Sequence, residues 1–373
     1  MRFTVGWWLV VSVGVVLLSL PLLSPIPEAP PWSLPVRELH PALSGDGSLL
    51  VCELWDGSGI RVTDLRAGAT RVVPARGANT PSLSGDGRWL AFASEASDLV
   101  PVDRDACAGI FLDDLARGTR LRIPSPVQTP GRCTSFWPAL SSDGRILCYS
   151  TWGTSEEVRR FVVRARGDSA VVPVPGLAYG RATFSPDGGQ LAVASTAGKR
   201  TDLYLLDLWR AARLYPTAAR LLTAGADGPS AGPVLAEGLC VFSSRARNLV
   251  PDDRNPGWDI FARDTRTGKV ALLTEGANDS SFEPSVSRDG RWVAFSSYAT
   301  NLAPCDGDGV CQVFLHDRVS HQTRCLSRGL SGSSYNPVIS RDGSRVVFVT
   351  RGADGSQALR FWTRQGDRLE AVE

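Results

Sequence analysis

The sequence predicts an all-β protein, a β-propeller of four-stranded antiparallel blades, and three observations support this prediction. The tetrapeptide Ser-x-Asp-Gly occurs six times, at residues 44–47, 84–87, 141–144, 185–188, 287–290 and 340–343. Nearly continuous apolar runs such as RWLAFAS and RWVAFSS follow these turns, which is typical of strands covered on both faces. Two further strands follow in each unit. Four strands in about 48 residues are typical of a propeller blade.

The number of blades follows from the spacing of these units. Between the fourth and fifth copies, a degenerate unit, LAEG at residues 235–238, precedes another apolar run, LCVFSS. With this unit we count seven blades, and six is the alternative if the first and last units share one blade. The units fill residues 40–373, so we expect this whole range to be propeller, without room for a second domain.

Each element of the unit has a local reason. Ser-x-Asp-Gly suits a hairpin whose first residues form a type I turn, while glycine takes the positive φ that follows. Pro186 occupies a position of the fourth turn where its fixed φ is favourable. A third strand, for example GIFLDD or DIFARD, ends in several units in a second turn of the form Asp-x-x-x-Gly. An outer strand such as TRLRIP then closes the blade.

The N-terminus carries an apolar run of 19 residues without charge, residues 5–23. As a helix this run is long enough to span a bilayer, so we expect residues 1–24 to form one hydrophobic helix acting as a signal-anchor. A cleaved signal peptide is the alternative. Because Arg2 precedes the run, we expect the remainder of the chain outside the cytoplasm, either tethered by a single pass or secreted or periplasmic after cleavage. Residues 25–39 form a Pro-rich linker.

Composition excludes several classes of protein. Lys and Arg number 40 against 38 Asp and Glu, and this net charge of +2 is too small to argue for a nucleic-acid partner. Hydrophobic residues make up 43% of the chain and charged residues 21%, as in a folded globular protein. The 37 Gly and 25 Pro favour tight turns and argue against a coiled coil or helical bundle.

The eight cysteines fit an exported protein, because disulfides persist in oxidising compartments. Cys305 and Cys311 bracket a five-residue loop and are predicted to form a disulfide. Cys107 and Cys133 are a second candidate pair, across one face of the propeller. The apolar runs around the other internal cysteines predict buried free thiols at Cys52, Cys148 and Cys240.

A family resemblance rests on the repeated motif itself. The pattern Pro-x-Leu-Ser-x-Asp-Gly-Arg-Trp-Leu-Ala-Phe-x-Ser, at residues 81–94 and again at 284–297 with Val for Leu, resembles the WD40-like repeat of TolB-type β-propellers. The resemblance covers nearly the whole exported part. It implies an interaction or ligand-binding scaffold with protein partners in the cell envelope. It leaves the oligomeric state open.

Three units carry a long insertion between their second and third strands. Aligned from a shared proline, these insertions hold an Asp-x-Asp or Asp-x-Asn pair, which is how many calcium loops begin. Calcium is therefore a candidate cofactor, although side chains that cap backbone amides are the favoured interpretation, and no other cofactor is expected. The candidate metal-binding residues are Asp103, Asp105, Asp253, Asn255, Asp306 and Asp308.

The residues directly before the innermost strands are predicted to form a ring at the mouth of the central channel. They include one aromatic residue, one acid and one base, and such a ring suits a small polar ligand or a peptide end. A solvated mouth without a ligand is the equal alternative. The predicted ring residues are His40, Thr80, Trp137, Arg181, Ala231, Glu283 and Asn336.

No catalytic activity is expected. A carbohydrate-active hydrolase or lyase that uses the channel mouth is the alternative function, and such an enzyme needs two carboxylates that converge there. Only Glu283 among the predicted ring residues is acidic. Nucleophile-elbow motifs are absent from the sequence, and the three histidines show no metal-binding spacing. The sequence therefore favours binding over catalysis.

Overall fold

The computed structural model describes residues 39–372, except for residues 102–107, 125–133, 153–158, 166–167, 173–175, 198–199, 209–218 and 306–308. The predicted N-terminal helix lies outside the described residues. In the part of the chain that is described, no helix is long and apolar enough to cross a membrane. Residues Arg37–Glu373 form one compact unit.

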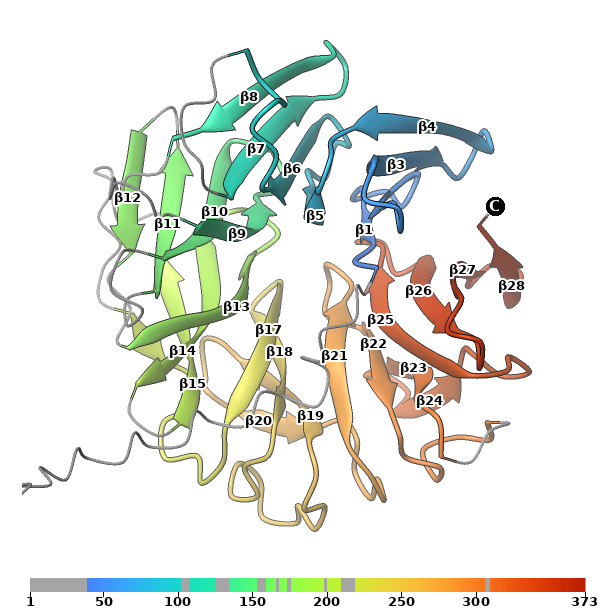
Figure 1. Cartoon of the computed structure of the whole chain (residues 1–373). Coiled ribbons are helices and arrows are strands. Elements are labelled where there is room, and N and C mark those ends of the chain that lie inside the picture. The colour runs from blue at the N-terminus through green and yellow to red at the C-terminus, as the bar shows by residue number, and fades with distance from the viewer. Residues whose placement is uncertain are drawn as a thin grey trace, which may run out of the picture. The chain divides into compact units, whose positions relative to one another are not determined.

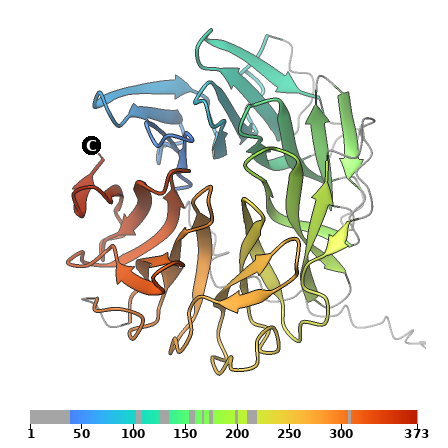
Figure 2. The same ribbon diagram turned by 180° about the vertical axis from the view of Figure 1, so that it is seen from behind.

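The described residues of this unit form seven four-stranded sheets, each with its strands in sequence order, arranged around a centre (Figures 1 and 2). Every strand pair is antiparallel, so the all-β propeller with four-stranded antiparallel blades is confirmed. We number the sheets blades 1 to 7 in chain order. None of the described sheets combines strands from the two ends of the chain.

The strands of blades 1 to 4 are β1 (Ala42–Leu43), β2 (Leu49–Glu53), β3 (Gly59–Asp64), β4 (Ala69–Pro74), β5 (Asn79–Leu83), β6 (Trp89–Ser94), β7 (Gly109–Asp114), β8 (Thr119–Ile123), β9 (Thr134–Leu140), β10 (Ile146–Trp152), β11 (Arg159–Ala165), β12 (Asp168–Val172), β13 (Leu177–Phe184), β14 (Gln190–Ala197), β15 (Arg200–Asp207) and β16 (Arg220–Leu221). Those of blades 5 to 7 are β17 (Ser230–Ala236), β18 (Leu239–Ser244), β19 (Asp259–Asp264), β20 (Val270–Leu272), β21 (Ser281–Val286), β22 (Trp292–Ser297), β23 (Gln312–Asp317), β24 (Gln322–Cys325), β25 (Ser333–Ile339), β26 (Arg345–Arg351), β27 (Gln357–Thr363) and β28 (Arg368–Ala371).

The Ser-x-Asp-Gly tetrapeptide forms the turn between the first and second strands, and each residue of it has a role. In blade 1 the Ser44 hydroxyl donates to Asp46 Oδ1 (2.7 Å) and accepts a hydrogen bond from the backbone N–H of Leu49 (2.9 Å). Asp46 Oδ1 also accepts from the backbone N–H of Ser48 (3.0 Å), and Gly47 has φ of 65°. The serine–aspartate bond recurs in all six copies. The repeat is therefore a self-contained hydrogen-bonded turn.

The same turns also link neighbouring blades. The N–H of the second turn residue donates to the carbonyl of its counterpart in the next blade, as from Gly45 to Gly85 (2.8 Å) and from Gly85 to Ser142 (2.8 Å). The link from Arg341 to Gly45 (3.1 Å) joins blade 7 to blade 1. A Cβ on Gly85 would lie 3.0 Å from the Ser142 carbonyl oxygen, so the turns are closely packed. Pro186 occupies this position in blade 4 and has no N–H to give.

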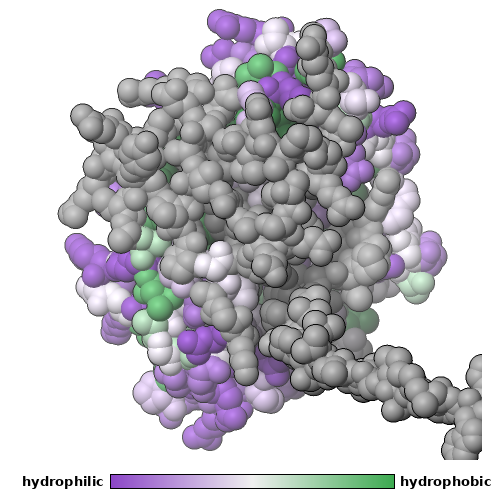
Figure 3. Space-filling model, turned by 60° about the vertical axis from the view of Figure 1, so that its left-hand side comes forward, coloured by the Kyte–Doolittle hydropathy of each residue, from purple (hydrophilic) through white to green (hydrophobic). Residues whose placement is uncertain are grey.

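The core lies between adjacent blades. One buried cluster joins Val51 and Ile60 of blade 1 to Leu90, Phe92 and Phe111 of blade 2. Similar clusters join blades 4 and 5, 5 and 6, and 6 and 7. The apolar second strands are thus covered on both faces, as their sequence predicts. The described surface in Figure 3 is mostly hydrophilic, with small hydrophobic areas.

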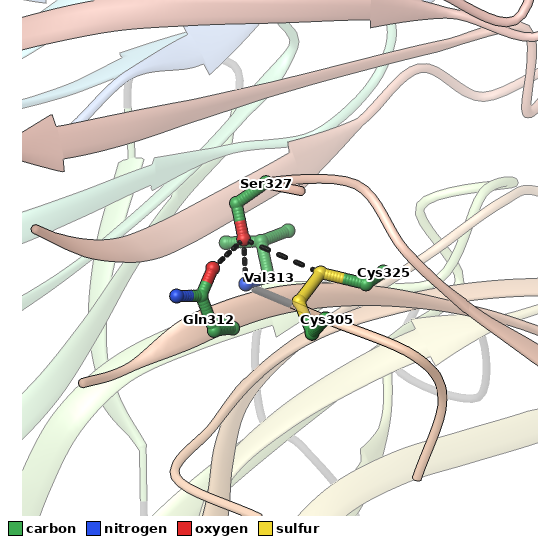
Figure 4. The surroundings of a disulfide bond; sticks show 5 residues. All are labelled: Cys305, Gln312, Val313, Cys325 and Ser327. Atoms are coloured by element: carbon green, nitrogen blue, oxygen red, sulfur yellow. Dashed lines mark hydrogen bonds between the residues drawn. A yellow bond between two sulfur atoms is a disulfide. The ribbon is translucent and has the colours of Figure 1, made fainter. Parts of the chain in front are cut away.

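The predicted pairing of Cys305 with Cys311 is wrong. Cys305 forms a disulfide with Cys325 at the end of β24, with 5.7 Å between the Cα atoms (Figure 4). Cys311 is buried directly before β23 and is not the partner of Cys305. The outer strand of blade 6 brings Cys325 beside the insertion that contains Cys305, a neighbour 20 residues away that loop spacing does not reveal. Cys107 and Cys133 lie outside the described residues.

The prediction of buried free thiols is confirmed. Cys52, Cys148 and Cys240 are buried and free. Burial raises the pKa of Cys240 to about 12 and raises those of the other two thiols as well. A thiol that stays protonated at physiological pH is a poor nucleophile and a poor metal ligand, so these cysteines contribute to packing.

Candidate functional site

The innermost strand of each blade from blade 2 to blade 7 contains a register shift, a β-bulge. Four residues at these bulges have positive φ although they are not glycine: Thr80 (48°), Trp137 (53°), Glu283 (54°) and Asn336 (53°). Each precedes a proline. Positive φ costs free energy for residues with a Cβ, and bulges redirect side chains. The four predicted ring residues therefore occupy equivalent, conformationally special positions.

Two blades depart from this pattern. In blade 5, Gly232 has the positive φ (58°) and precedes Pro233, so Ala231 is the wrong ring residue by one position. Ala231 is buried (6% exposed). The reason is that the turn of blade 5, residues 236–238, is one residue shorter than Ser-x-Asp-Gly. In blade 4, Gly180 has the positive φ (72°), and Arg181 follows it.

A carboxylate that the sequence analysis missed joins the ring at blade 1. The Glu53 carboxylate, at the end of β2, lies 2.7 Å from Nδ1 of His40. The Glu53 side chain is 10% exposed and that of His40 37%. Strand pairing places small side chains at the equivalent position of blades 2 to 6, such as Ala93 and Ser150. A charged residue where the repeat has Ala or Ser was the signal that could have identified Glu53.

Glu283 links blades 6 and 7. Its Oε2 atom accepts hydrogen bonds from the backbone N–H of Asn336 (2.9 Å) and from the Ser296 hydroxyl (3.0 Å). Burial raises the pKa of Glu283, while these bonds and the nearby His40 oppose the rise. The Asn336 side chain donates in turn to the backbone carbonyl of Leu39 (3.2 Å), the residue before His40. The acid of blade 6 is thus connected to the beginning of blade 1.

Arg181 reaches from blade 4 toward blades 1 and 2. Its Nη2 donates to the backbone carbonyl of Pro81 (3.0 Å). Burial lowers the pKa of Arg181, and the Glu53 carboxylate opposes this by favouring the charged guanidinium. The structure therefore brings together Arg181, Glu53, His40 and Glu283. Two carboxylates, an imidazole and a guanidinium can bind a molecule that carries both a negative and a positive group.

The other two ring residues are packed against their own strands. Thr80 is 7% exposed and donates from its hydroxyl to the side-chain oxygen of Asn79 (3.2 Å). The Trp137 ring lies edge-on to Phe136, with 4.7 Å between ring centroids. Both residues shape the inner wall of the propeller rather than add charge to it.

The predicted metal-binding residues are described only in blade 5. Asp253 Oδ1 accepts from the backbone N–H of Asn255 (3.1 Å), and Asn255 Oδ1 accepts from that of Gly257 (3.0 Å). These bonds cap backbone amides, which is the interpretation that the sequence analysis favoured. Among the described residues, no three His, Cys, Asp or Glu side chains are grouped to hold a metal ion. The other four candidates, Asp103, Asp105, Asp306 and Asp308, lie outside the described residues.

Neither a known protein family nor a curated protein matches the sequence. Solved structures are similar in fold. The β-propeller domain of the Trilobed protease from Pyrococcus furiosus, which has an open velcro topology, is 12% identical, with a TM-score of 0.62 over 90% of this chain and 97% of that one. TolB from Acinetobacter baumannii is 16% identical, with a TM-score of 0.50 over 89% of this chain and 78% of that one.

Peptidases also share the propeller. A puromycin-hydrolyzing peptidase from Mycobacterium tuberculosis is 15% identical, with a TM-score of 0.64 over 90% of this chain. This chain spans 53% of that peptidase. At these identities the similarity shows the fold alone, a TolB-like β-propeller.

Proposed function

We propose that this chain is an exported, membrane-tethered propeller scaffold of the cell envelope that binds a small polar ligand or the end of a peptide at its centre. The observation that carries the proposal is the convergence of Arg181, Glu53, His40 and Glu283 from blades 4, 1 and 6. Burying charged groups costs free energy, and apolar contacts alone can hold the blades together, so these charges are not needed for the stability of the fold. A ligand that pairs with these charges explains their presence.

The chemistry of the site suggests how such a ligand lies. Arg181 has five N–H donors, and the Pro81 carbonyl accepts from one of its nitrogens. The guanidinium can therefore bind a ligand carboxylate through two parallel hydrogen bonds, in bidentate geometry. The Glu53 and Glu283 carboxylates suit an amine. A free amino acid, or a peptide end with its own terminal charge, carries these groups.

A thermal-shift titration of the full chain with a set of dipeptides tests this function. We expect a dipeptide to raise the melting temperature saturably, and Arg181→Gln to weaken the apparent affinity at least about tenfold, the loss of one charge-assisted contact. Arg66→Gln is the matched control, because Arg66 is 64% exposed and pairs with Asp46 on the turn face. A saturable shift that survives Arg181→Gln would place binding elsewhere. No shift with any dipeptide would count against a peptide ligand at this site.

Membrane tethering is proposed from residues 5–23 alone. Fractionation of cells that express the full chain, followed by intact-mass measurement, distinguishes the two forms. Full-length mass in carbonate-washed membranes supports the signal-anchor. Loss of about residues 1–24 supports a cleaved signal peptide. Full-length chain in the soluble cytoplasmic fraction would contradict export.

A carbohydrate-active hydrolase is the second candidate, because Glu53 supplies a second carboxylate near His40, which is also close to Glu283. Glycoside hydrolysis uses two such groups on opposite sides of the scissile bond. One oxygen of Glu283 already accepts two hydrogen bonds, which favours a binding role over proton transfer. Chromogenic glycosides provide the assay. Turnover that disappears in both Glu53→Gln and Glu283→Gln would replace the scaffold with an enzyme.

A further inference from the structure

Blade 5 contains a cavity of about 650 Å³ away from the central ring. The insertion between β18 and β19 and the segment after β20 line it. Four of its lining residues are acidic and one is basic: Asp252, Asp253, Asp259, Glu275 and Arg254. A cavity with this excess of negative charge favours a cation.

Asp259 provides a second, independent observation. One of its oxygens, Oδ1, accepts a hydrogen bond from the Thr274 hydroxyl (2.7 Å), which itself accepts from the backbone N–H of Ile260 (3.0 Å). Its other oxygen, Oδ2, is buried and has no hydrogen-bond partner in the described structure. The residue is 1% exposed and lines the cavity. A buried carboxylate oxygen without a partner carries a large desolvation cost.

The same hydrogen-bonded unit occurs in two other blades, where no unpaired charge is buried, although the neutral Gln312 amide of blade 6 also has a buried nitrogen without a partner. In blade 4, Asp202 accepts from Thr223 (2.9 Å), and its second oxygen pairs with Arg200 (3.4 Å). In blade 6 the unit contains a neutral amide, Gln312, which accepts from the Ser327 hydroxyl (Figure 4). Of the three buried groups, Asp259 is the one that is acidic and forms no ion pair among the described residues. That difference points to a cation outside the chain.

The electrostatics of the cavity agree. Burial raises the pKa of Asp259 to about 6 and the nearby Asp253 carboxylate adds to the rise, while the side chains of Thr274 and Asn255 oppose it. Burial raises the pKa of Asp253 as well, while the backbone N–H of Asn255 and the Arg247 guanidinium oppose the rise. The two carboxylates therefore repel each other in a site that is partly closed to water.

We propose that Asp253 and Asp259 bind a calcium ion at the wall of this cavity, beside the Asn255 amide. Carboxylate and amide oxygens are hard ligands, which calcium prefers, and the lining contains neither His nor Cys for a softer metal. Calcium takes six to eight oxygens, and the cavity has room for the waters that complete this number. Because Ca–O distances of about 2.3–2.6 Å are shorter than hydrogen bonds, the ion can reach an oxygen nearly closed to water.

Calcium titration of the EDTA-treated full chain tests the proposal, with the melting temperature as readout. We expect a saturable increase with CaCl₂ and a much smaller one with MgCl₂ at equal ionic strength, because magnesium requires a stricter octahedral geometry. Terbium is a second readout, since Trp258 directly precedes Asp259 and can sensitise its luminescence. Calcium should displace the terbium.

Two variants decide the assignment. Asp259→Asn keeps the shape and a hydrogen-bond acceptor for Thr274, so it should fold and lose the calcium response, with affinity weakened at least about tenfold. Asp253→Asn gives the same expectation if the first variant folds poorly. Asp202→Asn in blade 4 is the matched control and should keep the response. Equal responses to calcium and magnesium, a response that survives in both blade 5 variants, or no response of the native chain would overturn the proposal.

Discussion

The backbone N–H of Arg341 donates a hydrogen bond of 3.1 Å to the carbonyl oxygen of Gly45, and so joins the last blade to the first. Because no described sheet shares strands from both chain ends, contacts of this kind close the propeller. The Arg341 guanidinium also donates to the Pro186 carbonyl (3.4 Å). This arginine therefore connects three turns at one end of the central axis.

Replacing Arg341 with proline tests this closure. Proline already occupies the equivalent position in blade 4, so the turn itself tolerates its backbone geometry. Arg341→Ala removes only the side chain, whereas Arg341→Pro also removes the N–H. We expect Arg341→Pro to lower the free energy of unfolding by about 1 kcal/mol more than Arg341→Ala. Urea unfolding of both variants measures the difference, and equal values would mean that the N–H link to Gly45 contributes nothing.

The strained bulge at Thr80 provides a second prediction. A β-branched residue with φ of 48° is unfavourable, while glycine occupies the equivalent positions in blades 4 and 5. We expect Thr80→Gly to raise the free energy of unfolding by about 1 kcal/mol. Thr70→Gly, at a position of β4 that pairs with Thr63 of β3, is the control and should lower it. A stability loss at residue 80 would show that its hydroxyl and packing outweigh the strain.

The sequence predicts the blade well because the blade is local. Ser44, Asp46 and Gly47 make their turn from contacts within five residues, so their spacing alone identifies it. The ring positions Thr80 and Glu283 follow from the same local pattern, although they lie within β5 and β21 and not directly before these strands as predicted. Nothing more distant is needed to locate them.

Contacts between segments were harder to predict. Glu53 reaches the centre from a second strand, so a search among residues before first strands passed over it. Cys325 meets Cys305 only because the outer strand of the blade returns beside the insertion. The ring position of blade 5 was assigned to Ala231 instead of Gly232, because the turn of this blade has three residues where the other blades have four. Each error arose where the pairing of strands in the fold, rather than the spacing of residues along the sequence, decides which side chains come together.

The disulfide leads to a third prediction. Oxidised protein digested without reduction should give a peptide pair linked through Cys305 and Cys325. A loop of this length constrains the unfolded chain by about 3 kcal/mol in the chain-entropy description. Cys325→Ser should therefore destabilise the oxidised chain clearly more than it destabilises the reduced chain. A linkage between Cys305 and Cys311 would contradict the structure.

His316 makes stability depend on pH. It is 5% exposed, its Nδ1 lies 2.9 Å from the Thr323 hydroxyl, and its Nε2 has no partner in the described residues. Burial, together with the positive charges nearby, lowers the pKa of His316 to about 4. The unfolded chain therefore binds the proton first as the pH falls. Its contribution to stability is complete above about pH 6.5 and is lost between pH 6.5 and pH 4, by about 3 kcal/mol.

Comparison with His316→Gln isolates this effect. Glutamine does not titrate, so the difference in unfolding free energy between the native chain and the variant should change across this pH window. Asp259 has the opposite effect on the unfolding free energy in this pH range: its pKa is raised in the folded chain, so protonation as the pH falls removes the cost of its buried charge. This effect is the same in the native chain and in the variant, so it cancels in the difference. Urea unfolding at pH 7, 6, 5 and 4 gives the difference directly. A constant difference would show that His316 is protonated as readily in the folded chain as in the unfolded one.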